Sequence, residues 1–192
     1  MSIATRDDAR MDGQHRLWLD RVSPLTIDVG DPANTRRITW VMCNPSTADG
    51  TEDDPTLRKV KGFTQRIAGG DLWRLRVVNL WTYRATYPRQ LTDVAELNHP
   101  AADTALREAI DWADTVIVAW GGVARSVPSY DERVDEVWSM LYRLGPMCLG
   151  TTADGDPRHP LMLSYDTELL GWFPPAAFRS VMDSLTPERS RE

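Results

Sequence analysis

The chain has 192 residues, 42% of them hydrophobic and 26% charged, which is an ordinary composition for a globular protein. No apolar stretch reaches the roughly 20 residues of a membrane-spanning helix, and the polar first residues lack the apolar core of a secretory signal. The net charge of −6 argues against strong duplex DNA binding, because neutralising many phosphates requires a basic face. We expect a cytoplasmic protein without membrane contact, with residues 1–15 as a flexible lead-in, 16–185 as one α/β domain and 186–192 as a flexible tail.

Residues 16–21 are predicted to form an antiparallel edge strand, and four short apolar runs follow it along the chain. These runs are almost continuously apolar, which is typical of parallel strands buried on both faces. They comprise residues 38–43, 75–78, 115–119 and 147–149. Cys43 and Cys148 fall inside them, so we interpret both cysteines as core thiols, not as a disulfide framework or a zinc site.

Segments with helical periodicity separate these runs. Apolar side chains recur at steps of three and four in residues 57–67, 106–113, 134–141 and 178–185, the last of which predicts a closing helix. Proline follows Asp54 at the start of the first segment, as is typical of the first turn of a helix. Strands and helices that alternate in this way favour right-handed crossovers. We therefore predict a three-layer α/β/α sandwich with a central, mostly parallel sheet of at least four strands.

A polar loop segment follows each predicted parallel strand. In an open parallel sheet, the loops at the carboxyl edge face one crevice, and ligands bind there. Asn44 follows the first run, Asn79 the second and Trp120 the third, while His159 lies in the loop after the fourth. We therefore expect Asn44, Asn79 and His159 to gather in one site although they are distant in sequence.

Asn44 and His159 are candidates for chemistry. The Asn44 carboxamide is suited to hold a water or a substrate carbonyl. The alternative is a turn in which Asn44 and Ser46 bond their own backbone. An imidazole at His159 is suited to stabilise negative charge on a substrate oxygen, and the alternative is a solvated loop histidine. A hydrolase triad of Ser46, His159 and an aspartate is weakly supported, because the chain has no Gly-x-Ser-x-Gly elbow.

An acidic cluster of Asp49, Glu52, Asp53 and Asp54 follows the first of these loops. Carboxylates of this kind bind hard cations, which makes a metal-dependent hydrolase one alternative. We interpret Asp54 as the cap of the next helix, whose positive end also favours Glu52 and Asp53. Asp49 has no such structural role and is the stronger functional candidate, as a general base or in orienting water.

Aromatic residues lie at or just past the strand ends. The rings of Trp81, Tyr83 and Trp120 are suited to stack on a base, and packing in the core is the alternative for each. Gly121 allows the backbone to approach a ligand or a helix closely. The chain has no Gly-x-x-x-x-Gly-Lys loop and no Gly-x-Gly-x-x-Gly fingerprint, so the usual triphosphate and dinucleotide sites are not expected.

Five motifs carry a resemblance to a known family. They are residues 42–49, 53–56, 78–86, 119–121 and 154–161. Together they resemble the bacterial and phage family called domain of unknown function 1643, whose name implies no activity, over about Leu17 to Trp172.

The order of elements more distantly resembles the uracil-DNA glycosylase superfamily. This resemblance implies that Asn44 positions the water, that Asn79 reads the base edge and that His159 stabilises the base anion. The chain departs from that superfamily after His159, because Leu161 and Met162 follow where a serine-rich turn grips the DNA backbone. These two residues are interpreted either as a wedge into DNA or as buried side chains.

We therefore expect a nucleobase-processing enzyme that acts on an N-glycosidic bond, with no cofactor and no metal. Its substrate is a nucleotide or a DNA base, with single-stranded DNA as one source. Asn44, Asp49 and His159 are the predicted catalytic residues. The predicted substrate-binding residues are Pro45, Ser46, Asn79, Trp81, Tyr83, Arg84, Trp120, Gly121 and Arg158. The alternatives are a non-catalytic nucleotide or nucleic-acid binding module and the metal-dependent hydrolase built on residues 49–54.

Overall fold

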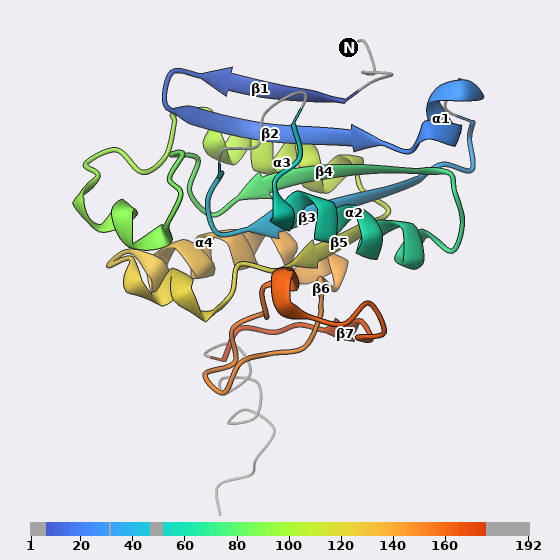
Figure 1. The fold of residues 1–192 in the computed structure, drawn as a ribbon. Helices are drawn as coiled ribbons and strands as arrows, with labels where there is room; N and C mark the ends of the chain where they lie inside the picture. Colours follow the sequence, from blue (N-terminus) through green and yellow to red (C-terminus); the bar gives the residue numbers. More distant parts are fainter. Residues whose placement is uncertain (1–6, 31, 47–51, 176–192) are drawn as a thin grey trace, which may run out of the picture.

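A computed structural model describes residues 7–30, 32–46 and 52–175, and within them the chain forms one seven-stranded sheet (Figure 1). The strands are β1 (Asp8–Asp12), β2 (His15–Val22), β3 (Arg36–Met42), β4 (Trp73–Asn79), β5 (Thr115–Val118), β6 (Met147–Cys148) and β7 (Leu170–Gly171). Their order in the sheet is β1-β2-β4-β3-β5-β6-β7. Strands β4, β3, β5 and β6 form a parallel centre, and β1, β2 and β7 pair antiparallel with their neighbours.

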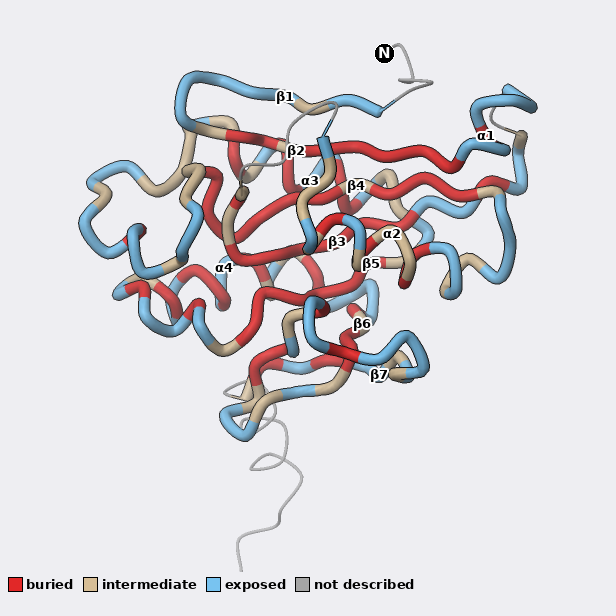
Figure 2. The backbone as a smooth tube through the Cα atoms, viewed as in Figure 1, coloured by how far each residue is buried: buried red, intermediate tan, exposed pale blue. Residues whose placement is uncertain are grey.

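Helices cover both faces of the sheet. The helices are α1 (Pro24–Asp28), α2 (Pro55–Ala68), α3 (Ala102–Trp112) and α4 (Tyr130–Leu141), with short 3-10 segments η1 (Pro88–Asp93), η2 (Gly122–Ser126), η3 (Tyr142–Leu144) and η4 (Pro160–Met162). On one face, α2 packs Leu57 and Val60 against Trp40 of β3. On the other face, Leu106 of α3 and Val137 of α4 pack against the same sheet. The strands between these layers are the most buried part of the chain (Figure 2), so the three-layer arrangement is confirmed.

The predicted strands and the three predicted helices that fall within the described residues are found close to their predicted positions. Helix α2 begins at the predicted residue. The Asp54 carboxylate accepts a hydrogen bond from the Leu57 N–H at 2.7 Å, and Pro55 occupies the first turn. That helix ends at Gly69, whose φ of 68° is a left-handed conformation that glycine adopts without strain. Cys43 and Cys148 are buried free thiols, as expected.

The amino-terminal part differs from the prediction. Residues 8–12, expected in a flexible lead-in, form β1 and pair with β2. Strand β2 is antiparallel as predicted, but it is not an edge strand, because β1 covers its outer side. The predicted closing helix at 178–185, the predicted tail at 186–192 and Asp49 lie outside the described residues. No helix within the described ranges is long and apolar enough to cross a membrane.

The strand order creates a crevice at the carboxyl edge of the sheet. Strand β3 lies between β4 and β5, so the chain runs from β3 to β4 on one side and then crosses back to β5 on the other. Loops that leave neighbouring strands in opposite directions leave room between them for a ligand. The end of β2 that carries His15 also reaches this edge, because β2 is antiparallel to β4.

Candidate functional site

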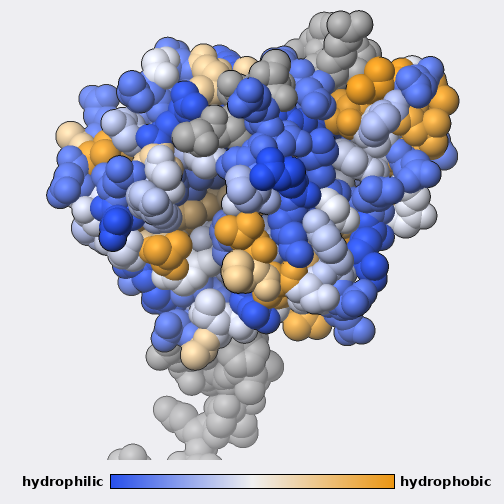
Figure 3. All heavy atoms as spheres, viewed as in Figure 1, coloured by the Kyte–Doolittle hydropathy of each residue, from blue (hydrophilic) through white to orange (hydrophobic). Residues whose placement is uncertain are grey.

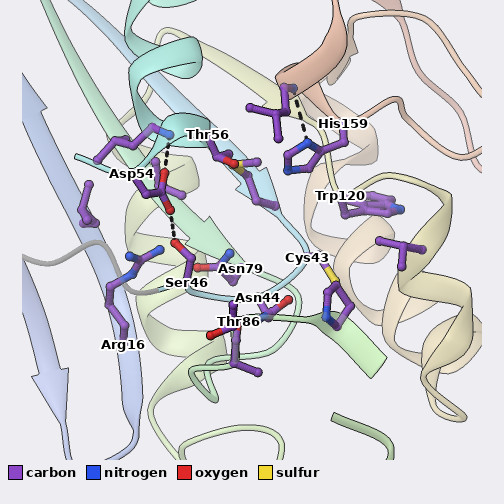
Figure 4. A pocket seen from close by; sticks show the side chains of 18 residues that line it. Arg16, Cys43, Asn44, Ser46, Asp54, Thr56, Asn79, Thr86, Trp120 and His159 are labelled. Atoms are coloured by element: carbon purple, nitrogen blue, oxygen red, sulfur yellow. Dashed lines mark hydrogen bonds between the residues drawn. The ribbon is translucent and has the colours of Figure 1, made fainter. Parts of the chain in front are cut away.

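A cavity of about 290 Å³ opens at this carboxyl edge, and its wall comes from several distant parts of the chain (Figure 4). Asn44 follows β3, Asn79 ends β4, Trp120 follows β5 and His159 precedes η4. Arg16 of β2 closes one side. The structure therefore brings Asn44, Asn79 and His159 into one cavity, as the topology predicted.

Asn79 is the most unusual residue of this wall. The residue is only 4% exposed, and neither its Oδ1 nor its Nδ2 has a hydrogen-bond partner among the described residues. A buried amide atom without a partner costs about 1–3 kcal/mol of stability. Native proteins contain few such groups, so each one needs a reason. A ligand that offers an acceptor and a donor side by side would satisfy both atoms.

Asn44 has a different role, because its amide nitrogen is already engaged. Nδ2 donates to the carbonyl oxygens of Pro45 at 3.0 Å and Ala85 at 2.7 Å, which ties the loop after β3 to the loop after β4. The alternative prediction, a turn in which Asn44 bonds the backbone of its own loop, is therefore confirmed in part. Only its Oδ1 remains as an acceptor, which suits a water molecule and not a substrate carbonyl.

His159 points its ring into the cavity from the opposite side (Figure 4). Its Nδ1 accepts a hydrogen bond from the Leu161 N–H at 3.3 Å, so the neutral imidazole carries its proton on Nε2. Burial lowers the pKa of His159, and the negative charge of Asp54 opposes part of this effect. The neutral ring with an Nε2–H donor is therefore the prevailing form at neutral pH, and it is suited to stabilise negative charge on a ligand.

The backbone at Gly121 lies close to His159. Its φ of 76° and ψ of 158° belong to a region that only glycine adopts readily. A Cβ at this position would lie 3.0 Å from the Cβ of His159. The Gly121 N–H also donates to the Pro157 carbonyl at 2.9 Å. The close approach at Gly121 is therefore made to His159, and not to a helix as one of the two predicted alternatives had it.

Charged and hydroxyl groups form the wall beside Asn79. Ser46 Oγ donates to the Asp54 carboxylate, which also caps α2 (Figure 4). Ser46 therefore bonds an aspartate directly, and the weak triad hypothesis for Ser46 with His159 gains no support. The guanidinium of Arg16 is buried here, and burial lowers its pKa to about 10 while the nearby Asp54 partly offsets that effect. The wall thus combines a cation, an anion and an unsatisfied amide.

Asp53, another residue of the acidic cluster, is held in ion pairs. Asp53 accepts from Arg21 Nε at 2.7 Å and from Lys61 Nζ at 2.8 Å. Burial would raise the pKa of Asp53, but the hydrogen bonds from Lys61 and Arg21 outweigh it and hold the pKa below its usual value. An aspartate held by two cations is a poor metal ligand, and no group of three or more metal-binding side chains occurs within the described part of the chain.

The aromatic residues divide between wall and core. Trp120 lines the cavity but is fully buried, with its Nε1–H bonded to Tyr130 Oη at 3.1 Å. Trp81 is buried in the core cluster, away from the lining, so its expected stacking role is not supported. Tyr83 also lies outside the lining, with its ring edge against His15 at 5.7 Å between centroids.

Three further predicted binding residues lie outside the lining of the cavity. Pro45 is buried, and its carbonyl accepts from the Ala85 N–H at 3.0 Å. Arg84 Nε donates to the Ser46 carbonyl at 3.5 Å. Arg158 is exposed, and its N–H bonds the Gly150 carbonyl at 2.9 Å. These contacts shape the loops that carry the site, but none of the three residues lines the cavity.

Sequence reasoning missed two notable residues of the cavity. The sequence predicts Arg16 only as the start of a strand. A charged residue at the beginning of an apolar strand could have indicated a functional role at the edge of the sheet. Cys43 was read as a core thiol, yet it lines the cavity, where burial raises its pKa to about 12 and keeps it protonated.

The rim of the cavity is partly apolar. Figure 3 shows a mostly hydrophilic face with separate groups of hydrophobic side chains. Val123 and Leu161 both line the cavity and are exposed, and the neighbouring Met162 is 90% exposed. The interpretation of Met162 as a buried side chain is therefore wrong.

Fold and site together define an α/β protein whose mostly parallel sheet opens at its carboxyl edge into a small cavity with both polar and apolar walls. The family model described as "Protein of unknown function (DUF1643)" matches residues 16–161, which is more than half of the chain. The chain therefore belongs to this family, as its motifs predicted. The matched range contains Arg16, Asn44, Asn79 and His159. No curated protein and no solved structure matches the chain at a significant level.

Proposed function

We propose that this protein is a nucleobase-processing enzyme that hydrolyses the N-glycosidic bond of a nucleoside, a nucleotide or a DNA base. The observation that carries this proposal is the Asn79 amide, 4% exposed and unsatisfied at both atoms among the described residues, in the wall of the cavity that His159 also lines. The hydrogen-bonding edge of a nucleobase presents a donor and an acceptor side by side. Such an edge would satisfy both atoms of Asn79 at once.

The size of the cavity supports a small, flat ligand. Its volume of about 290 Å³ lies at the lower end of the roughly 300–1,000 Å³ found for small-molecule sites. Met42, Leu57 and Val77 supply apolar surface in the same lining, where the faces of a planar ring would pack. One base, with or without its sugar, suits these dimensions better than a dinucleotide.

The residues of the wall suit the proposed reaction. When the C1′–N bond breaks, its electron pair moves onto the base, and the Nε2–H of neutral His159 would donate to the atom that gains negative charge. A water oxygen forms the new bond to C1′, and the water proton ends on the released base. The free Oδ1 of Asn44 is suited to orient that water, and Asp49, outside the described residues, is proposed to act with it.

We further propose a likeness to the uracil-DNA glycosylases, which implies that Asn44, Asn79 and His159 share one site. The source of the base is a further part of the proposal. A net charge of −6 favours a free nucleotide or single-stranded DNA over a duplex, because extruding a paired base costs a few kcal/mol more. The exposed Leu161 and Met162 at the rim would contact a base or sugar next to the one in the cavity.

Base release is the direct test of this proposal. The purified protein is incubated with nucleosides, nucleotides and single- or double-stranded oligonucleotides that carry deaminated or alkylated bases, and free base is detected by mass spectrometry. His159→Ala and Asn79→Leu should abolish release, whereas Glu132→Gln on exposed α4 surface should not. Tight binding without any release would favour the binding module, and release that chelators abolish would favour the metal-dependent hydrolase.

A further inference from the structure

A second polar network lies directly behind the cavity wall. Its centre is Asp156, whose side chain is only 1% exposed. Tyr130 Oη donates to Asp156 Oδ1, and Arg125 Nε donates to Oδ2 at 2.6 Å. Tyr130 Oη in turn accepts a hydrogen bond from Trp120 Nε1 at 3.1 Å. The network therefore runs from a side chain of the cavity wall to a buried carboxylate and on to a partly exposed arginine.

This arrangement fixes the geometry of the carboxylate. A buried carboxylate is tolerated only when it is paired and hydrogen-bonded, and here each oxygen has its own donor from a different element. Burial raises the pKa of Tyr130, which keeps the hydroxyl protonated as a donor. Tyr130 begins α4, Arg125 belongs to η2 and Asp156 lies in the loop after β6, so the network joins three elements at one point.

The loop that Asp156 anchors is the loop that carries His159. Thr152 bonds Asp156 twice, with its N–H donating to the Asp156 carbonyl at 2.8 Å and its Oγ1 accepting from the Asp156 N–H at 3.2 Å. The next residue, Pro157, accepts from the Gly121 N–H at 2.9 Å. Gly121 then packs against the Cβ of His159. A displacement of Asp156 would thus reach His159 through one peptide bond, one backbone hydrogen bond and one close contact.

We propose that Asp156 is a positioning residue for His159, and that its hydrogen bonds from Tyr130 and Arg125 hold the imidazole at the cavity wall. The same network holds Trp120, so it fixes two parts of the wall at once. This inference rests on the proposed function for its effect on rate. Its structural part, the placement of the imidazole, stands independently of any substrate.

The test compares Asp156→Asn and Tyr130→Phe with Thr39→Val. Tyr130→Phe removes one hydroxyl and keeps the packing of the ring. Thr39→Val is a matched control, because it removes one buried hydroxyl that donates to the Ala109 carbonyl at 2.7 Å, between β3 and α3 and outside the network. The first readout is the NMR titration of the His159 ring, which needs no substrate. The second is the separate measurement of kcat and KM on whichever substrate is cleaved.

We expect the His159 pKa to move up toward its ordinary value of 6.5 in both network variants, because a displaced ring is less buried. Thr39→Val should leave the titration unchanged. Since misplacing a catalytic group by about 1 Å lowers rates by as much as roughly 100-fold, kcat should fall at least about tenfold with KM little changed. Folded variants in which the His159 titration and kcat match the wild type would overturn the proposal. A displaced titration in a protein that releases no base would refute the proposed function and leave the positioning role intact.

Discussion

Replacing Asn79 by leucine should stabilise the protein in the absence of ligand. Leucine has the same number of side-chain heavy atoms as asparagine and a similar branched shape, so the cavity wall keeps its packing. The substitution removes two buried polar atoms that have no partner among the described residues. The neighbouring Met42 and Val77 are apolar and accommodate the new methyl groups.

The size of the effect follows from the desolvation of the amide. Leaving a buried polar group unsatisfied costs about 1–3 kcal/mol, and Asn79→Leu should recover an amount in this range. For a chain of 150–250 residues, each kcal/mol changes Tm by about 2–4 °C, so a rise of roughly 2–12 °C is expected. Most substitutions in a protein core lower stability, so the sign of the change alone is informative.

Urea denaturation and differential scanning calorimetry measure this change directly, and Asn44→Leu is the matched control. The Asn44 amide donates to Pro45 and Ala85, so the same substitution there removes two hydrogen bonds and should destabilise the protein by about 1–3 kcal/mol. Opposite signs at the two asparagines are predicted. If Asn79→Leu destabilises the protein as much as Asn44→Leu does, the Asn79 amide is satisfied and the argument for a ligand there is lost.

Three further outcomes are expected. Because burial lowers the pKa of His159, the unfolded chain binds a proton at this residue more readily than the folded protein does. The free energy of unfolding should therefore fall as pH drops below 6.5, and it should fall less steeply in His159→Gln. Equal slopes in urea denaturation series at several pH values would contradict this expectation. Gly121→Ala should destabilise by about 1–3 kcal/mol and change the NMR signals of the His159 ring. Gly145→Ala, with a φ of 60° and open space around it, should leave that ring unchanged, and an unchanged ring in Gly121→Ala would refute the contact. Asp54→Ala should lower the stability of the protein to thermal unfolding by about 0.5–2 kcal/mol, because it removes the N-cap of α2. Asp54→Asn should keep most of this stability, and equal losses in the two variants would show that the charge of Asp54, and not its capping hydrogen bond, is what matters.

The fold and the centre of the site could be predicted from the sequence because both depend on chain order. Near-continuous apolar runs indicated parallel strands, and the carboxyl ends of such strands meet at one edge. This reasoning correctly placed Asn44, Asn79 and His159 together, and it needed no knowledge of side-chain orientation. The cap at Asp54 was predictable for a similar reason, since helix starts carry a local signal.

Side-chain directions beyond the strand ends could not be predicted in this way. Trp81 and Trp120 both follow apolar runs, yet only Trp120 lines the cavity, because the loop geometry decides which ring turns toward the core. Asp53 gave an acidic signal in sequence, and only the tertiary fold brings Arg21 close enough to neutralise it. Strand β1 has a mostly exposed, polar sequence, so no periodic pattern marked it and only its pairing with β2 creates it.

The central claim is that Asn79 and His159 together hold a nucleobase, and a crystal structure with a bound nucleoside or free base tests it most directly. We expect a base edge within about 2.7–3.2 Å of both amide atoms of Asn79, with an acceptor atom of the base at the same range from His159 Nε2. A base bound elsewhere on the protein, or one in the cavity that leaves the Asn79 amide without partners, would contradict it.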